Sequence, residues 1–348
     1  MFELKMTDYD HQVYEKELKP FLPEKFIDVH THIGKATFGP LEEKTVGRTY
    51  VGNVTRSWPS LSPLGDAQFE MLTDGLKKMF PDNEVIPVLF GDCSHNIHQV
   101  NDYVLECGKA NGFPMLYRSS YLMPLDELEE NVKKGGFLGL KPYLNQRPSY
   151  IPPNEIRIFD FLTKEQLEVA DRNGWIIMLH IPRPGRLKDK VNLAELMAIE
   201  EKYPNVKLIV AHIGRAYSKE DIGDAFEILK NTKNMLFDFT ANLSSDAISA
   251  CIQAVGCKRL MFGSDLPVAF MRLYRITENG TYINVVPKGY YGDVSNVTNI
   301  RESENEDITL MLYEQLRAFK RSAMELRLTD TDIEDIMYNN AKKLFMER

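Results

Sequence analysis

The sequence lacks the features of several large classes of proteins. No two of its four cysteines form a C-x-x-C pair, so neither a thiolate zinc site nor a redox motif is indicated. No apolar run approaches the roughly 20 residues of a membrane-spanning helix, and residues 1–25 have neither the apolar segment nor the cleavage site of a secretory signal peptide. We therefore expect a cytoplasmic protein without a membrane partner, whose thiols stay reduced. The cysteines are Cys93, Cys107, Cys251 and Cys257.

An excess of positive charge is also absent. The chain has 42 Lys and Arg residues against 50 Asp and Glu residues, which gives a formal net charge of −8. A protein that binds duplex nucleic acid needs a basic face, so we expect no nucleic-acid partner. Hydrophobic residues make up 43% of the chain and charged residues 26%, which is typical of a globular protein rather than a disordered or collagen-like one.

Eight short apolar runs alternate with helical patterns along the 348 residues. Several runs are almost continuously apolar, as expected for parallel strands that are buried on both faces. This alternation predicts a closed (β/α)8 TIM barrel, which commonly takes about 250 residues as one domain. The alternative is an open doubly wound sheet, but that fold usually has a glycine-rich turn after its first strand, and residues 30–34 do not form one. The runs are Phe26–His32, Val85–Asp92, Met115–Leu122, Phe137–Leu144, Ile176–Ile181, Val206–Gly214, Met235–Thr240 and Arg259–Asp265.

Four of the intervening helices have sequence signals for their first residues. A Ser, Thr or Asn followed three residues later by an acidic residue or a glutamine has the spacing of a capping box. Gly174 suits the left-handed position that ends the first of these helices. The expected caps are Thr163, Asn192, Ser218, before a helix that reaches residue 229, and Thr331, before a last helix over 333–345.

Two long segments do not fit a minimal barrel. Residues 35–64 follow the first predicted strand, and residues 266–305 follow the eighth. Active sites of barrels lie at these carboxyl ends, so we interpret the segments as loops that shape a pocket as lids, or as subunit contacts, for instance of a homodimer. We therefore expect one distorted barrel domain over 1–348, with its core at about 26–265, an insertion at 266–305 and C-terminal helices at 306–348.

Two histidines in the first predicted strand are candidates for a metal site. His30 and His32 are two residues apart in Asp28-Val29-His30-Thr31-His32, so they share one face of the strand. Two imidazoles on one rigid strand lose little entropy when they are positioned for binding. Such a pair also occurs by chance, with both rings hydrogen-bonded inside a barrel.

Three further polar residues lie at or near the ends of predicted strands. His180 ends the fifth strand, His212 is near the end of the sixth, and Asp265 ends the eighth. A barrel brings these ends into one ring. Imidazoles and a carboxylate at the end of an apolar core are unfavourable unless a metal ion or a substrate satisfies them, so the pattern favours a metal site over a set of structural histidines.

Five motifs in order along the chain resemble a known family. They are Asp28-Val29-His30-Thr31-His32, His180, Ala211-His212-Ile213-Gly214, Phe262-Gly263-Ser264-Asp265-Leu266-Pro267 and Asn340-Ala341-Lys342-Lys343-Leu344-Phe345. This set resembles the amidohydrolase superfamily, in particular the branch that includes the aminocarboxymuconate-semialdehyde decarboxylases. The resemblance implies a distorted barrel in which His30, His32, His180 and Asp265 bind a divalent metal ion, with His212 as the catalytic acid or base beside it.

Lys141, on the predicted fourth strand, has three interpretations. Superfamily members with two metal ions use a carbamylated lysine on this strand as a bridge, which the resemblance makes one alternative. An ordinary ammonium group could instead bind a substrate carboxylate. In the third alternative the side chain extends out of the barrel rim into solvent.

Several arginines follow the ends of predicted strands. Around the mouth of a barrel they would attract an anionic substrate, and the planar guanidinium suits carboxylates; they could equally form salt bridges on a solvated rim. We select Arg183 and Arg215 as candidate substrate-binding residues. Asp92 and Asp238 could orient metal ligands or be ordinary polar residues of the barrel. The arginines are Arg118, Arg183, Arg186, Arg215, Arg272 and Arg275.

Together these residues predict a metal-dependent hydrolase that acts on an amide, ester or lactone bond of a small anionic substrate. Asp265 would take a proton from the attacking water, and His212 would stabilise the oxyanion or protonate the leaving group. The ligands suit zinc, with manganese and iron as alternatives, and one ion, or two if Lys141 is carbamylated. The same residues could serve a decarboxylase (a carbon–carbon lyase) that acts on a conjugated or aromatic carboxylate. A third hypothesis is a binding protein that kept the barrel without catalysis.

Overall fold

The structure is a computed structural model that describes residues 3–39, 67–93, 95–295 and 297–347, and the structural statements below refer to these residues. Residues 40–64 of the first expected insertion lie outside them. Eight strands occur at the positions of the eight apolar runs, most of them shorter than predicted. They are β1 Lys25–Ile33, β2 Glu84–Gly91, β3 Tyr117–Ser119, β4 Gly139–Pro142, β5 Ile176–Leu179, β6 Lys207–Val210, β7 Leu236–Asp238 and β8 Leu260–Met261.

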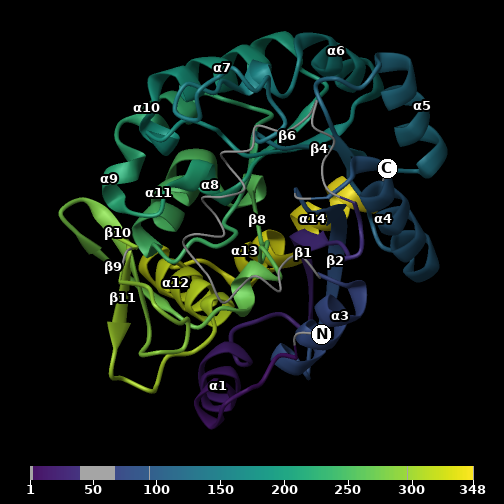
Figure 1. Ribbon diagram of the computed structural model, residues 1–348. Helices are drawn as coiled ribbons and strands as arrows, with labels where there is room; N and C mark the ends of the chain where they lie inside the picture. The colour runs from purple at the N-terminus through teal and green to yellow at the C-terminus, as the bar shows by residue number, and fades with distance from the viewer. Residues whose placement is uncertain (1–2, 40–66, 94, 296, 348) are drawn as a thin grey trace.

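The strands form two parallel hydrogen-bonded groups that join into one barrel. β1 pairs with β2, and β3 to β8 pair in sequence order. Next to β3, the backbone N–H of Leu116 donates to the carbonyl of Leu89 in β2 at 3.0 Å. Just after β8, the N–H of Asp265 donates to the carbonyl of His30 in β1 at 2.9 Å. The ring is therefore closed, as predicted, and Figure 1 shows the helices surrounding it.

Helices follow the strands on the outside of the barrel (Figure 1). Among the described residues, no helix is both long enough and apolar enough to cross a membrane. The helices after β1 to β7 are α3 Phe69–Met79, α4 Ile97–Asn111, α5 Leu125–Gly135, α6 Lys164–Asn173, α7 Lys190–Lys202, α8 His212–Arg215, α9 Lys219–Ile222, α10 Ala225–Leu229 and α11 Ser245–Val255. After β8 follow α12 Met311–Leu326, α13 Asp330–Glu334 and α14 Asn340–Phe345.

The expected helix caps were only partly correct. The Thr163 hydroxyl accepts the backbone N–H of Gln166 at 3.2 Å, and Gly174 ends α6 with a φ of +64°. The cap expected at Asn192 is wrong, because the Asp189 carboxylate accepts the first N–H groups of α7. A capping-type residue three positions earlier therefore starts this helix.

The two later helices also differ from expectation. Ser218 does precede α9, but Gly223, with a φ of +55°, ends it, so the run to residue 229 is divided into α9 and α10. The cap expected at Thr331 is wrong, because Thr329 and Asp332 form the capping box of α13. A π-helical turn over Asp335–Asn339 then separates α13 from α14.

An apolar cluster fills the barrel and is closed at one end by the C-terminal helix. The cluster includes Ile27, Met178 and Ile209 from three strands and Ala341 and Phe345 from α14. The Lys25 ammonium, at the amino end of β1, lies 6.0 Å from the centroid of the Tyr338 ring, just before α14. Because the C-terminal segment covers the amino ends of the strands, the carboxyl ends are left for polar side chains.

The insertion at 266–305 contains a small sheet rather than loops alone, so the expectation of loops is wrong in part. The antiparallel pair β9 Tyr274–Glu278 and β10 Thr281–Pro287 is joined in parallel by β11 Ile300–Ser303. Asn279 and Gly280 form the connection, with φ values of +49° and +72°. An Asn-Gly pair of this kind is a hairpin signal, and the sequence analysis overlooked it.

The small sheet packs beside the carboxyl end of β7. Val286 of β10 belongs to an apolar cluster with Ala241 and Leu243, which follow β7, and with Met311 at the start of α12. Figure 1 shows β9, β10 and β11 together at the edge of the barrel near α9 and α12. The insertion is therefore fixed to the end of the barrel that carries the polar strand tips.

A buried ion pair joins the N-terminal segment to the start of the insertion. Asp10, in α1 Asp8–Val13, is 0% exposed and accepts a hydrogen bond from Nη1 of Arg272 at 2.9 Å. The Thr309 hydroxyl donates to the same carboxylate at 2.7 Å. Burial alone would raise the pKa of Asp10, but the hydrogen bonds from Arg272, Thr7 and Thr309 outweigh it and lower the pKa below the usual 3.8.

We expect Asp10→Asn to lower the free energy of unfolding at neutral pH by about 3 to 5 kcal/mol, because it leaves the Arg272 guanidinium buried without its counter-charge. A carboxylate with a lowered pKa stabilises the fold above its unfolded pKa of 3.8 and loses this effect as the pH falls below it. The gap between variant and wild type in urea denaturation should therefore narrow below about pH 4. Asp8→Asn, in the exposed first turn of the same helix, should change stability by less than about 0.5 kcal/mol, and an equal loss in both variants would contradict the assignment.

Candidate metal centre

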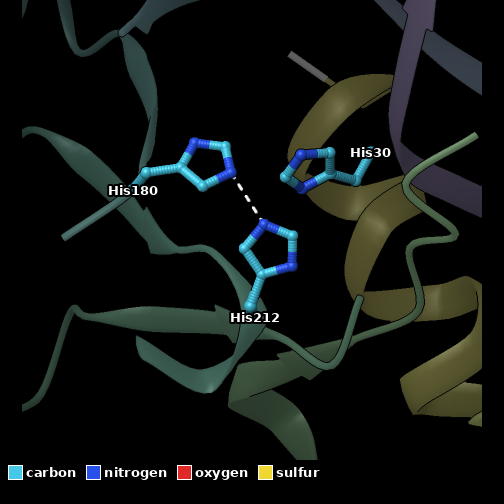
Figure 2. Close-up of side chains that lie close together, drawn as sticks. All are labelled: His30, His180 and His212. Atoms are coloured by element: carbon cyan, nitrogen blue, oxygen red, sulfur yellow. Dashed lines mark hydrogen bonds between the residues drawn. The ribbon is translucent and has the colours of Figure 1, made fainter. Parts of the chain in front are cut away.

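Five polar side chains from the carboxyl ends of four strands meet at one end of the barrel. His30 and His32 belong to β1, His180 directly follows β5, His212 follows β6, and Asp265 follows β8. Figure 2 shows the imidazoles of His30, His180 and His212 turned toward one another. Their ring centroids lie 4.7 to 5.3 Å apart. The ring of strand ends thus brings together residues that are far apart in the sequence.

An irregularity in β1 aims its two histidines. The register between β1 and β2 shifts between Asp28 and Thr31, a feature that commonly redirects side chains near functional sites. The Asp28 carboxylate accepts the backbone N–H groups of His30 at 3.1 Å and of Ser264 at 2.8 Å, which ties this bend to the segment after β8. The rings of His30 and His32 face the same site, 5.2 Å apart, as their spacing predicted.

Hydrogen bonds behind the rings decide which nitrogen carries the proton in His30 and His212. Nδ1 of His30 lies 3.1 Å from the Asp238 carboxylate, and Nδ1 of His212 lies 2.9 Å from the Thr240 carbonyl. Ionised carboxylate and carbonyl oxygens only accept, so Nδ1 is the donor in both rings and Nε2 of the neutral ring carries a lone pair. Nε2 of His30 is buried and has no hydrogen-bond partner.

His32 repeats this arrangement with a different acceptor. The Tyr143 hydroxyl donates to the Gly91 carbonyl at 2.7 Å, so its oxygen accepts from Nδ1 of His32 at 3.0 Å. Nε2 of His32 lies 3.0 Å from Oδ1 of Asp265, and Nε2 of His30, whose proton is on Nδ1, lies 3.6 Å from the same oxygen. Electron-rich atoms at these distances repel unless a proton or a cation lies among them. This donor set fits a divalent metal ion.

His180 lies between Lys141 and His212. Its Nδ1 is 2.7 Å from Nζ of Lys141, and its Nε2 is 2.7 Å from Nε2 of His212. Lys141 is 0% exposed, so the interpretation of a side chain extending into solvent is wrong. Burial lowers the pKa of Lys141 to about 7, although the nearby charges of Asp238 and Asp265 act to raise it. A carbamate and a contact with the substrate are the interpretations that remain for this lysine.

Two overlapping triads among the described residues have ligand atoms close enough to share an ion. One is His30, His180 and His212, and the other is His30, His32 and Asp265; within each triad the ligand atoms lie within 4.8 Å of one another. The four ligands expected from the sequence therefore span both triads. His212, expected as an acid or base, lies as close to His30 and His180 as a ligand would.

Burial sets the protonation states of these groups. Removal from water lowers the pKa of His212, and lowers the pKa of His30 and His180 well below the usual value, with Lys141 adding to the effect in these two. Burial alone would raise the pKa of Asp265, but its hydrogen bond with His32 and the nearby imidazoles outweigh it and lower the pKa. Neutral imidazoles and an ionised carboxylate are the forms that bind metal ions.

Left-handed backbone accompanies the residues that leave the strands. The four residues of α8, from His212 to Arg215, have φ values of +58°, +50°, +60° and +61°, and Asp265 has a φ of +69°. For residues other than glycine this conformation costs about 1 to 2 kcal/mol each. It persists where neighbouring groups hold it, as Asp238 does by accepting the backbone N–H of His212 at 2.7 Å. The abrupt turn directs His212 inward instead of continuing β6.

Neither arginine expected to bind substrate contacts these histidines through a hydrogen bond or ion pair that the described residues show. Arg183 forms ion pairs with Glu155 and Asp189, each at 3.2 Å. Arg215 donates from Nη1 to the carbonyls of Ile181 and Pro182, each at 3.3 Å, and makes no ion pair with a described residue. Arg272 does not line the mouth at all, because it binds Asp10.

Two groups that orient the histidines were not found from the sequence, although a third was. Asp238 orients His30 as expected, whereas Asp92 is paired with His95 at 2.8 Å. Tyr143 was missed; its place two residues after Lys141, directly after the end of β4, was the available signal. The carbonyl of Thr240 could not be found, because a backbone acceptor leaves no trace in the residue type.

Comparisons with known proteins identify the family and agree with the fold. A model of the amidohydrolase family matches residues 27–346, and no curated protein sequence matches the chain. A probable 2-pyrone-4,6-dicarboxylic acid hydrolase from Acinetobacter baumannii is similar in structure, with a TM-score of 0.58, 16% identity and coverage of 92% of this chain and 98% of the other. A dihydroxybenzoic acid decarboxylase from Polaromonas sp. JS666, with bound manganese, is similar with a TM-score of 0.55 and 15% identity, and the match covers 94% of this chain and 98% of the other. A 5-carboxyvanillate decarboxylase from Sphingomonas paucimobilis is similar with a TM-score of 0.56 and 11% identity, and the match covers 93% of this chain and 99% of the other.

We expect Asp238→Asn to weaken the binding of a divalent metal ion, with zinc as the probe, by about tenfold to a hundredfold, because the neutral amide holds the Nδ1 proton of His30 less strongly and no longer supports the turn at His212. Competition with a chromophoric chelator measures the affinity, and circular dichroism reports on folding. Asp74→Asn, on the exposed face of α3, is the matched control and should bind zinc as the wild type does. Unchanged affinity in folded Asp238→Asn would show that this carboxylate does not orient a ligand.

Proposed function

The chain belongs to the amidohydrolase family, and on this premise we propose that it is a metal-dependent hydrolase that cleaves an amide, ester or lactone bond of a small anionic substrate. The observation that supports this most directly is Nε2 of His30, which is buried without a hydrogen-bond partner and lies 3.6 Å from Oδ1 of Asp265, the oxygen that Nε2 of His32 also contacts at 3.0 Å. Buried structural histidines normally have their polar atoms paired.

We place one divalent ion among His30, His32, His180 and Asp265. Imidazoles with a single carboxylate suit zinc, with manganese and iron as alternatives, and the similar dihydroxybenzoic acid decarboxylase holds manganese. A second ion would require a carbamate on Lys141 as a bridge. When bound, such an ion would polarise the scissile carbonyl and lower the pKa of water from 15.7 to about 7.

Asp265 and His212 would transfer the protons. The lowered pKa of Asp265 keeps its carboxylate ionised, so it can accept a proton from the attacking water. The Thr240 carbonyl holds the Nδ1 proton of His212, so this ring takes up and releases a proton only at Nε2. Protonated there, His212 would stabilise a negative oxygen or pass the proton to the leaving group.

Lys141, Arg183 and Arg215 are the proposed contacts for the substrate's negative charge. Lys141 is best placed, since its amine already touches a histidine of the centre. Arg215 has no carboxylate partner among the described residues. Arg183 would have to exchange Glu155 or Asp189 for the substrate.

A decarboxylase is the second candidate, and the likeness in fold to two decarboxylases is the reason to test it. In that reaction the bond between a substrate carbon and its carboxylate breaks, CO2 leaves, and the electron pair stays on the carbon. Asp265 or His212, once protonated, would deliver a proton to that carbon. The substrate would have to be a conjugated or electron-rich aromatic carboxylate, which can stabilise the carbanion.

We expect zinc-loaded protein to hydrolyse at least one member of a panel of carboxylate-bearing lactones, esters and amides, and to release no CO2 from hydroxybenzoates. Acid production and CO2 release are measured side by side, with His30→Ala as the inactive control. CO2 release without hydrolysis would select the decarboxylase. Protein that retains no metal and gains no activity from zinc or manganese would overturn both candidates and favour the binding protein.

We expect His212→Asn to lower kcat about 100- to 10,000-fold, because the reaction loses its acid or base, while the bound metal stays. Metal analysis and steady-state kinetics on the same sample separate these effects. His98→Asn, on the exposed face of α4, is the control and should keep full activity. Loss of the metal in His212→Asn would instead identify His212 as a ligand.

A further inference from the structure

Two arginines and two tyrosines from separate segments gather beside the metal centre. Arg186 follows β5, Tyr217 follows α8, Arg275 lies on β9, and Tyr282 lies on β10. We call these residues the Arg–Tyr cluster. The first two come from the barrel and the last two from the inserted sheet, so the cluster exists only because the insertion packs against the mouth of the barrel.

Each guanidinium of the cluster lies against both aromatic rings. The Cζ atom of Arg186 is 5.5 Å from the Tyr217 centroid and 4.7 Å from the Tyr282 centroid, and Cζ of Arg275 is 4.8 and 4.9 Å from the same two. The rings meet edge to face, 5.3 Å apart. Stacking of this kind restricts a long side chain, so less entropy is lost when the guanidinium binds a ligand.

The pairing of β9 with β10 explains why the inserted sheet presents these residues together. Arg275 is opposite Asn284, and Tyr282 is two residues before Asn284, so all three lie on one face of the sheet. Nε of Arg275 donates to the Asn284 side-chain oxygen at 2.7 Å. The face that carries Arg275 and Tyr282 is therefore the one turned toward Tyr217.

The charge of Arg275 is not neutralised within the described part of the chain. Arg186 has a carboxylate partner in Asp221. Arg275 instead uses two of its nitrogens on neutral oxygens, those of Asn284 and of the Ala241 carbonyl, the latter at 2.7 Å, and it forms no ion pair with a described residue. Burial lowers its pKa, as does the charge of Arg186 beside it. A partly buried guanidinium that forms no ion pair is unfavourable, and an anionic ligand would relieve this.

The cluster also adjoins the proposed acid or base. The Tyr217 ring lies 6.3 Å from the His212 ring, and the Tyr217 hydroxyl makes no hydrogen bond to any described residue. The Ala241 carbonyl that binds Arg275 follows directly on Thr240, whose carbonyl holds Nδ1 of His212. A ligand held by Arg275 would therefore lie on the His212 side of the metal centre.

We propose that the Arg–Tyr cluster binds a second carboxylate of the substrate, with Arg275 as the principal donor and the Tyr217 hydroxyl as an additional one. This inference rests on the proposed function, because it assumes that the reacting group of the same molecule occupies the metal centre. The substrate is accordingly a small molecule with an anionic group remote from the bond that reacts, and Arg275 and Tyr217 determine specificity.

The test compares two probes of the same shape, isophthalate and 3-acetylbenzoate, by isothermal titration calorimetry on zinc-loaded protein. Isophthalate should bind at least about tenfold more tightly, because it offers the second charge. Arg275→Gln should reduce this ratio to less than about twofold, and Tyr217→Phe, which keeps the stacked ring, should reduce it about threefold. Arg301→Gln is the control, because Arg301 pairs with Glu278 on the exposed part of the same inserted sheet and should leave the ratio unchanged.

Equal affinity of the wild type for both probes would overturn the proposal. It would also be overturned if the ratio of the affinities for isophthalate and 3-acetylbenzoate is unchanged in both Arg275→Gln and Tyr217→Phe. A third probe, 3-phosphonobenzoate, would overturn it if only this ligand shows dependence on Arg275, since the site would then be a phosphate site. The same titrations on metal-free protein separate this proposal from the proposed function. Protein that fails to bind zinc but keeps an Arg275-dependent preference for isophthalate would refute the metal-dependent hydrolase and retain the carboxylate site.

Discussion

The centre of this protein depends on where three histidines place their Nδ1 protons. Asp238, the Tyr143 hydroxyl and the Thr240 carbonyl accept hydrogen bonds from Nδ1 of His30, His32 and His212, respectively. Each acceptor is part of the barrel or of a loop that directly follows a strand, so its position is fixed by the fold. The Nε2 atoms consequently face the site, where those of His30 and His32 lie 3.6 and 3.0 Å from one oxygen of Asp265, an arrangement that is stable only when a cation or a proton is shared among these atoms.

The barrel makes this arrangement possible by dividing its two ends between two tasks. The C-terminal segment packs Ala341 and Phe345 against the apolar interior, so the amino ends of the strands serve stability. The carboxyl ends are then free to carry groups that oppose folding, among them the left-handed turn at His212 and the buried amine of Lys141. Strain and desolvation of this kind are expected at functional sites and have to be offset by packing elsewhere.

The sequence predicted those parts of the structure that follow from periodicity and from the position of strand ends. Eight apolar runs gave eight strands, and His180, His212 and Asp265 could be brought together because parallel strands end at one rim. It did not reveal Thr240, whose contribution is a backbone carbonyl, or the pairing of Arg272 with Asp10, which are far apart in the chain. The hairpin at Asn279-Gly280 could have been predicted, since that dipeptide is a local signal. The packing of the hairpin beside β7 could not, because it depends on tertiary contacts.

Reaction chemistry and substrate choice therefore come from different parts of the molecule. The groups that hold protons at the metal centre belong to the barrel, and a fold shared at 16% identity or less with hydrolases and decarboxylases does not decide among their reactions. The inserted sheet contributes to none of those hydrogen bonds and meets the centre where Arg275 binds the Ala241 carbonyl, next to Thr240. A change on the face of β9 and β10 could thus alter the ligand without removing a hydrogen bond of the histidines, because the sheet reaches the centre only through the Ala241 carbonyl, next to Thr240, and through the Tyr217 ring.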